Sequence, residues 1–315
     1  MLYYIIHIFV KATCWLYCKK ITVNNKTAFQ ESGPTLIIAN HPNSFLDAIL
    51  IGSIFKRRIH YLARGDAFKK KRHRTILKML NMIPVYRLRE GKENLHLNGY
   101  AFEESRRILN NGGIVLIFIE GICLNIHDLQ PFKKGAARIA ESVDPEKNLK
   151  ILPISIAYNS FNRFGKSVVI SAGKTMEAKQ LFPYKLSSRN YNYFNQYFFP
   201  IIDQLIQLPV YEKTKNNIFY RTLGTIGKLI HLPYYYPVQQ FVKERTAGTV
   251  FYDSVLFGLM LITYPIYLLL ISCLLFAIFR SFYIILLSIL IHLISARIYV
   301  LHKKEPPPTL VPMSN

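Results

Sequence analysis

The stretch "TLIIANHPNSFLD", residues 35–47, decides how this chain folds. Its first five residues are apolar, as in a short strand that is buried on both faces. His41 precedes Pro42, which biases the His41 backbone away from the helical region. Ser44 is a favourable helix N-cap, and Asp47 stands three residues later in the capping-box position. The stretch therefore predicts a strand, a loop that carries His41, and a helix that begins at Ser44.

Strand-like and helix-like patterns alternate from residue 34 to about residue 175. The strand-like runs are short and apolar, and several of the helix-like runs are basic and amphipathic. This alternation predicts an α/β fold in which helices are layered on a largely parallel sheet. The predicted strands are 35–40, 59–63, 83–87, 114–120, 149–158 and 166–173, and the predicted helices are 44–55, 68–80, 92–110 and 133–142.

Two apolar segments near the C-terminus predict a transmembrane helical hairpin. Residues 255–279 contain no charged side chain, and residues 281–296 follow directly after Arg280. A helix needs about 20 apolar residues to cross the hydrocarbon core of a bilayer. The second segment is shorter and contains His292, so a half-inserted arm is an alternative, as is the core hairpin of a soluble protein. Lysine and arginine at the outer ends of the hairpin predict that both ends are cytoplasmic.

The chain is strongly basic, with a formal net charge of +22. Its densest basic patch, residues 56–74, contains nine Lys or Arg and one acidic residue. Such a charge fits either nucleic acid or an anionic membrane surface. No nucleic-acid recognition motif is present, and the apolar segments favour the membrane. The four cysteines are scattered, which predicts neither a metal site nor a disulfide framework.

Chemically useful side chains follow the ends of several predicted strands. His41 lies beyond the first strand, and a loop before the helix lets Asp47 fold back to the His41 ring. An imidazole held by a carboxylate is an oriented general base, and open α/β sheets place their sites at strand ends of this kind. A turn histidine beside a capping aspartate is the alternative interpretation of the same two residues.

Three further features lie at neighbouring strand ends. Arg87 ends one strand, and Glu120 and Gly121 follow another. Lys133 precedes a helix start, where positive charge and free amides suit an anion. Each feature alone is typical of a surface or turn residue. Together they predict one pocket that holds a base, a carboxylate and cationic phosphate-binding groups.

Four ordered blocks within residues 34–175 resemble the membrane-associated glycerophospholipid acyltransferases, the family of 1-acylglycerol-3-phosphate and glycerol-3-phosphate acyltransferases. The blocks are "NHPNSFLD", "IPVYR", "FIEG" with "PFKKG", and "LPISIAY". The resemblance implies a catalytic Asn-His…Asp motif and an arginine and a lysine that bind the acceptor's phosphate. The matching residues are Asn40, His41, Asp47, Arg87, Phe118, Glu120, Gly121, Lys133 and Pro153.

This resemblance implies an O-acyltransferase that moves a fatty acyl group from acyl-CoA or acyl carrier protein to a hydroxyl of glycerol-3-phosphate or lysophosphatidic acid, without a cofactor or metal. The sequence departs from the common family pattern at three points. Five residues instead of four separate His41 from Asp47, Ile119 replaces a proline, and "ICLN" follows Gly121. The acceptor's head group therefore stays open, with another lysophospholipid or an acylated amino-acid lipid as alternatives. A catalytically inactive basic lipid-binding membrane protein is the alternative of a different class.

These patterns predict a membrane protein whose catalytic domain lies on the cytoplasmic face. The predicted divisions are an apolar and basic membrane-interface segment (1–33), the acyltransferase domain (34–180), an aromatic, basic helical cap or membrane-interface region (181–252), the hairpin (253–302) and a disordered tail (303–315).

Overall fold

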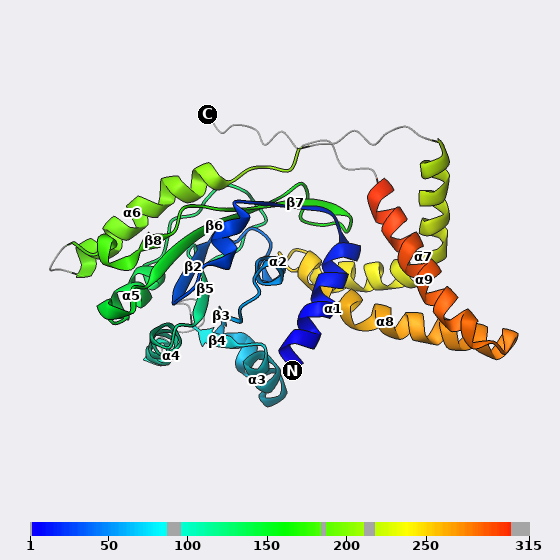
Figure 1. Cartoon of the computed structure of the whole chain (residues 1–315), viewed down its shortest axis with the longest axis horizontal. Helices are drawn as coiled ribbons and strands as arrows, with labels where there is room; N and C mark the ends of the chain where they lie inside the picture. The colour runs from blue at the N-terminus through cyan, green and yellow to red at the C-terminus, as the bar shows by residue number, and fades with distance from the viewer. Residues whose placement is uncertain (1, 87–95, 184–186, 211–217, 304–315) are drawn as a thin grey trace.

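A computed structural model describes residues 2–86, 96–183, 187–210 and 218–303 of the chain (Figure 1). Among these residues, eight strands form one sheet in the order β1-β7-β6-β2-β5-β3-β4, with β8 paired to β6. The strands β2 to β6 run parallel to one another, while β7 is antiparallel to β6. The strands are β1 (Cys18–Asn24), β2 (Thr35–Ala39), β3 (Ile59–Arg64), β4 (Met82–Val85), β5 (Ile114–Phe118), β6 (Lys150–Tyr158), β7 (Lys166–Ala172) and β8 (Met176–Glu177).

Helices cover both faces of the sheet. The helices are α1 (Leu2–Tyr17), α2 (Phe45–Ile54), α3 (Lys71–Met79), α4 (Asn98–Asn110), α5 (Gly135–Ser142), α6 (Ser187–Leu205), α7 (Ile218–Thr246), α8 (Tyr252–Phe279) and α9 (Phe282–His302). Short 3-10 turns lie at Lys26–Gln30, Gly65–Phe68, Pro145–Lys147 and Ala178–Leu181.

Strand β2 shows why the sheet has two cores. Its side chains alternate in direction, so Leu36 and Ile38 join the core under α4, α5 and α6. Ile37 and Ala39 join the opposite core, which contains side chains of α1, α2, α7 and α8. A strand that is buried on both faces reads as an unbroken apolar run. The predicted α/β fold with a largely parallel sheet is therefore confirmed.

The structure corrects one detail of the predicted domain boundaries. The segment 1–33 was predicted to lie at the membrane interface, but β1 within it pairs in parallel with β7. The α/β domain therefore begins before residue 34. Of the predicted helix 92–110, residues 92–95 lie outside the described residues, and α4 begins at Asn98. Residues 304–315 of the predicted tail also lie outside them.

The aromatic region 181–252 divides into two helices with different surroundings. Phe194, Phe198 and Ile202 of α6 are buried against the sheet, so this helix caps the domain. The next helix, α7, lies beside α9 (Figure 1), and its second half contributes Tyr234, Tyr235 and Val242 to the core on the other face of the sheet. The cap alternative therefore holds for α6, and the membrane-interface alternative stays a prediction.

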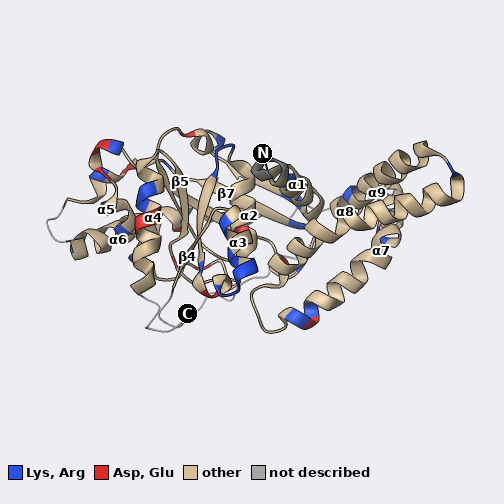
Figure 2. Ribbon diagram, turned by 90° about the horizontal axis from the view of Figure 1, so that it is seen from below, with Lys and Arg blue, Asp and Glu red and all other residues tan. Residues whose placement is uncertain are grey.

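The two apolar C-terminal segments form α8 and α9, which pack side by side as a hairpin. The turn between them is Arg280 and Ser281. Both helices are long and apolar enough to cross a membrane, and only 17% of the most apolar stretch of each is buried inside the protein. Most of this hairpin is uncharged (Figure 2), and its charged residues are Asp253, Arg280 at the turn and Arg297, whereas α3 carries a run of basic residues. The hairpin is thus a candidate membrane-spanning unit that is packed on an otherwise charged α/β domain.

We expect the Gly227→Ala substitution to destabilise the helical region. A Cβ atom at Gly227 of α7 would lie 2.5 Å from the backbone oxygen of Ser295 in α9. Overpacking against a backbone atom costs about 1–3 kcal/mol. Gly258→Ala in α8 is the matched control, because nothing lies within 4 Å of its added Cβ. Thermal unfolding in detergent measures both, and equal melting temperatures for the two variants would contradict the close α7–α9 contact.

Candidate active site

His41 and Asp47 face each other at the carboxyl end of β2. The Nδ1 atom of His41 lies 2.9 Å from Oδ2 of Asp47. The Asp47 side chain is fully buried, whereas 20% of the His41 side chain is exposed. When Nδ1–H donates to the carboxylate, Nε2 keeps its lone pair and can accept a proton. The predicted pairing of these two residues is therefore present in the structure.

Asp47 accepts two further hydrogen bonds. The hydroxyl of Tyr158, at the end of β6, donates to Oδ1 at 2.6 Å. The backbone N–H of Asn43 donates to Oδ2 at 2.8 Å. Burial raises the pKa of Tyr158, and the neighbouring Asp47 charge raises it further, so the phenol stays protonated as a donor. These bonds hold the carboxylate in the orientation that the imidazole needs.

The expected capping box at the start of α2 is wrong. Ser44 does occupy the N-cap position, but its side chain makes no capping hydrogen bond, and its φ is +53°. Its backbone N–H donates to Sγ of Cys123 at 3.0 Å instead of to Asp47. Asp47 cannot cap the helix because its carboxylate is turned toward His41. Ser44, with its positive φ, makes the turn from the His41 loop into α2.

Phe118, at the end of β5, fixes the plane of the His41 ring. The two ring centroids lie 3.8 Å apart, and the planes differ by 11°. Stacking on one face leaves the imidazole little freedom to rotate about its bond to Cβ. The ring is thus held in its plane by Phe118 and at its Nδ1 edge by Asp47.

Glu120 joins the loop after β2 to the loop after β5. Its Oε1 accepts the backbone N–H of His41 at 2.7 Å, and its Oε2 accepts that of Gln130 at 2.8 Å. Burial raises the pKa of this carboxyl, and the two N–H donors partly oppose the rise. Glu120 was predicted to bind substrate. Both of its oxygens are occupied by the protein's own backbone, which indicates that it holds the loops together.

Asn40 has a comparable arrangement one residue before His41. Its Nδ2 donates to the carbonyl of Ile156 at 3.0 Å, and its Oδ1 accepts the Ile156 N–H at 2.8 Å. The residue is 2% exposed. Asn40 therefore continues the pairing of β2 with β6 by one residue through its side chain, and it fixes the point from which His41 projects.

Gly121 and Lys133 lie next to each other beside this loop. Gly121 has φ +64°, and a Cβ atom there would lie 3.1 Å from Cγ of Lys133. The backbone N–H of Lys133 donates to the carbonyl of Ile119 at 2.8 Å, which places this exposed lysine beside the end of β5. Arg87, the other predicted phosphate-binding cation, lies outside the described residues.

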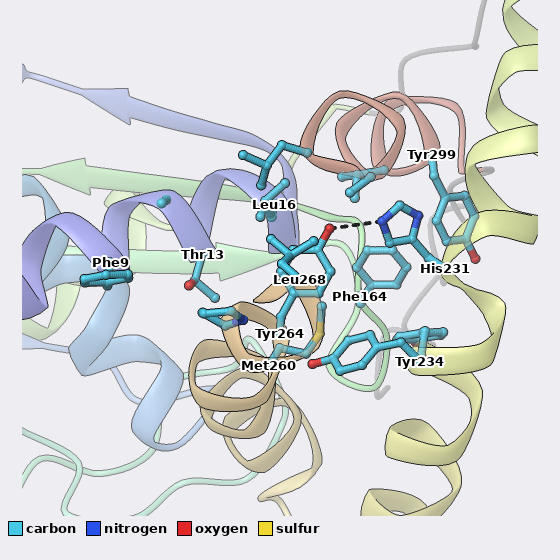
Figure 3. A pocket seen from close by; sticks show the side chains of 16 residues that line it. Phe9, Thr13, Leu16, Phe164, His231, Tyr234, Met260, Tyr264, Leu268 and Tyr299 are labelled. Atoms are coloured by element: carbon cyan, nitrogen blue, oxygen red, sulfur yellow. Dashed lines mark hydrogen bonds between the residues drawn. The ribbon is translucent and has the colours of Figure 1, made fainter. Parts of the chain in front are cut away.

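A separate apolar cavity lies among α1, α7, α8 and α9 (Figure 3). Its volume is about 260 Å³, and Phe9, Leu268 and Phe164 contribute to its wall. One polar contact within it is the hydrogen bond between His231 Nε2 and the Tyr264 hydroxyl, at 3.0 Å. None of the described site residues lines this cavity. In the described part of the chain, no three His, Cys, Asp or Glu side chains gather in a way that could hold a metal ion.

Residues 20–157 are similar to one known protein family. These residues match the family model described as Acyltransferase. The chain is 28% identical over 146 residues to the "Probable 1-acyl-sn-glycerol-3-phosphate acyltransferase" of Mycoplasma genitalium, which covers 45% of this chain and 51% of the relative. The chain thus spans about half the length of this relative. It also resembles the crystal structure of the 1-acyl-sn-glycerophosphate (LPA) acyltransferase PlsC from Thermotoga maritima, with 20% identity, a TM-score of 0.46, and coverage of 64% of this chain and 78% of that one.

We expect Tyr158→Phe to lower the free energy of unfolding by about 1.5–3 kcal/mol, the usual contribution of a hydrogen bond to a charged group. The substitution keeps the ring but removes the donor 2.6 Å from Asp47. Tyr197→Phe is the matched control, since its hydroxyl lies 3.5 Å from the thioether of Met176. Chemical denaturation in detergent compares the two. Equal losses would show that Asp47 does not depend on Tyr158.

Proposed function

We propose, because residues 20–157 match the Acyltransferase family model, that the protein transfers a fatty acyl group from a thioester to a hydroxyl of a glycerophosphate-type acceptor. The observation that carries the proposal is the His41–Asp47 pair at 2.9 Å, in which the ring is stacked on Phe118 and Asp47 is buried. An imidazole held in this way has the properties of a general base for acyl transfer.

The proposed reaction uses His41 twice. Its Nε2 removes the proton from the acceptor hydroxyl while that oxygen attacks the thioester carbonyl. When the tetrahedral intermediate collapses, the C–S bond breaks, and the imidazolium returns the proton to the leaving thiolate. Asp47 stabilises the imidazolium and holds its orientation. Base catalysis contributes about 10²–10⁴-fold, and the alignment of the two substrates contributes much of the remainder.

We propose lysophosphatidic acid as the acceptor, with glycerol-3-phosphate next. The relative from Mycoplasma genitalium is named for an activity on 1-acyl-sn-glycerol-3-phosphate, and Lys133 stands beside the end of the strand that carries Phe118. Arg87 keeps its predicted role as a second phosphate ligand. Both acyl-CoA and acyl carrier protein are acidic, so the basic segment 56–74 suits either donor.

We further propose that α8 and α9 hold the protein in a membrane with the catalytic domain on the cytoplasmic face. Both helices have the length and composition of a membrane span. Lys243 and Arg245 precede the hairpin, and Arg297 and Lys303 lie toward its other end, which favours a cytoplasmic location of both ends. In this orientation the basic segment 56–74 faces anionic lipid head groups and the donor.

Turnover assays with acyl-CoA and acyl carrier protein donors, and with phosphorylated and other lysolipid acceptors, test the activity. We expect His41→Ala to abolish transfer and to remain folded, because the Asn43 N–H and the Tyr158 hydroxyl still donate to Asp47. Asp47→Asn should keep a small residual rate, since the base remains but is held less well. His41→Ala turnover near the wild-type rate would exclude the mechanism. Wild-type transfer only to other lysolipids, or to none, would favour a different acceptor or a lipid-binding role.

We expect Lys133→Ala to raise the KM for a phosphorylated acceptor by about tenfold, which corresponds to the loss of about 1.4 kcal/mol. The KM for the donor should change much less. Lys134→Ala is the matched control, because this neighbouring lysine is also exposed and occupies the N-cap of α5. Steady-state kinetics with both substrates varied separate the two effects. An unchanged acceptor KM in Lys133→Ala would remove this lysine from the phosphate site.

A further inference from the structure

The first turn of α8 touches the loop that carries His41, although the two are separated by about two-thirds of the chain. Ser254 Oγ accepts the backbone N–H of Leu46 at 3.0 Å and donates to the carbonyl of Asn43 at 3.3 Å. Asp253 Oδ2 accepts the side-chain amide of Asn43 at 2.8 Å. The beginning of the candidate membrane hairpin therefore holds both the side chain and the backbone of this loop.

Asp253 is itself fixed from two other directions. Lys166 of β7 forms an ion pair with its Oδ2, and the Tyr17 hydroxyl at the end of α1 donates to its Oδ1 at 2.9 Å. The side chains of Asp253 and Lys166 are fully buried. Burial lowers the pKa of Lys166, and Asp253 opposes this shift. The cluster thus joins the sheet, α1, α8 and the His41 loop around one carboxylate.

Burial of such a cluster costs desolvation free energy, which indicates that it serves more than stability. Two charges removed from water lose hydration that their attraction only partly restores, and apolar pairs of similar volume often stabilise a fold as well or better. Buried ionic groups are instead used in some proteins to fix one arrangement among several. Here the fixed element is Asn43, whose backbone N–H donates to Asp47.

We propose that Asp253 and Ser254 are positioning residues, through which the docked C-terminal hairpin sets the loop geometry that keeps Asp47 against His41. The chain of contacts runs from Asp253 and Ser254 to Asn43, from Asn43 to Asp47, and from Asp47 to His41. In this series of contacts, neither Asp253 nor Ser254 touches the His41 ring itself. The inference rests on the proposed function for its kinetic part and on the loop contacts alone for its structural part.

The kinetic test is Ser254→Ala in the full chain. We expect kcat to fall by about tenfold to a hundredfold, because a displacement of the base of about 1 Å costs up to about 10²-fold. The KM for both substrates should stay within about twofold. Ser254→Thr restores a hydroxyl and should recover most of the rate. Ser272→Ala is the matched control, since Ser272 is buried in the same helix and bonds to Ser288 instead of the loop.

A second measurement does not require turnover. Sγ of Cys123 accepts the Ser44 N–H at 3.0 Å, and burial raises the pKa of this thiol to about 12, so it should react slowly. Displacement of the loop should expose it. In a Cys273→Ser background, we expect maleimide labelling of Cys123 to be several-fold faster in Ser254→Ala than in Ser272→Ala.

A double variant separates positioning from folding. Lys166→Met with Asp253→Leu replaces the buried ion pair by an apolar pair, which should preserve the fold, while the loss of the acceptor of the Tyr17 hydroxyl lowers the melting temperature. It also removes the acceptor of the Asn43 amide. We expect fast Cys123 labelling and low kcat in a folded protein. Slow labelling of Cys123 in both the double variant and Ser254→Ala would overturn the inference. If the wild-type protein is active, an unchanged kcat in these variants would overturn it as well. Fast labelling with no wild-type activity on any acceptor would instead support the positioning and reject the proposed function.

Discussion

The buried carboxylate of Asp47 is the constraint on which the site depends. A carboxylate removed from water must be compensated by hydrogen bonds or opposite charge. Asp47 meets this requirement with the His41 ring, the Asn43 backbone and the Tyr158 hydroxyl. These donors come from the loop after β2 and from the end of β6. Satisfying one buried group therefore fixes two neighbouring strand ends relative to each other, and the imidazole is oriented as a consequence.

The parallel sheet makes this arrangement possible because it brings the carboxyl ends of β2, β5 and β6 to one edge. Each strand end then supplies a different kind of support. Phe118 of β5 restricts the plane of the imidazole, and Glu120 binds the backbone of His41. Asn40 completes the pairing of β2 with β6. Most of the polar groups near His41 are thus used to hold it, which leaves its Nε2 edge as the chemically available part.

The sequence predicted the order of the strands and helices, the His41–Asp47 pairing and the apolar hairpin, because each has a local signal: an apolar run, a proline after the histidine, or a long uncharged segment. It did not predict β1, since "CKKITVN" alternates weakly and needs β7 as its partner. Tyr158 and Asp253 were also missed. Their roles depend on contacts across 111 and 210 residues, and no short-range pattern records such contacts.

The position of the hairpin in the chain has a consequence for how the site forms. The loop around His41 emerges early in synthesis, but Asp253 and Ser254 belong to the last quarter of the chain. Until α8 docks, Asn43 lacks the acceptor of its amide, and Lys166 lacks its counter-charge in a region that becomes fully buried. An unpaired buried ammonium is strongly disfavoured, so burial of Lys166 beneath β7 is unfavourable until α8 supplies Asp253. Because α8 continues into a segment suited to a bilayer, docking of its first turn links completion of the site to placement of the hairpin. Under the proposed function, the His41 loop would reach its final geometry where the hairpin is accommodated in a membrane, which is also where a lipid acceptor is found.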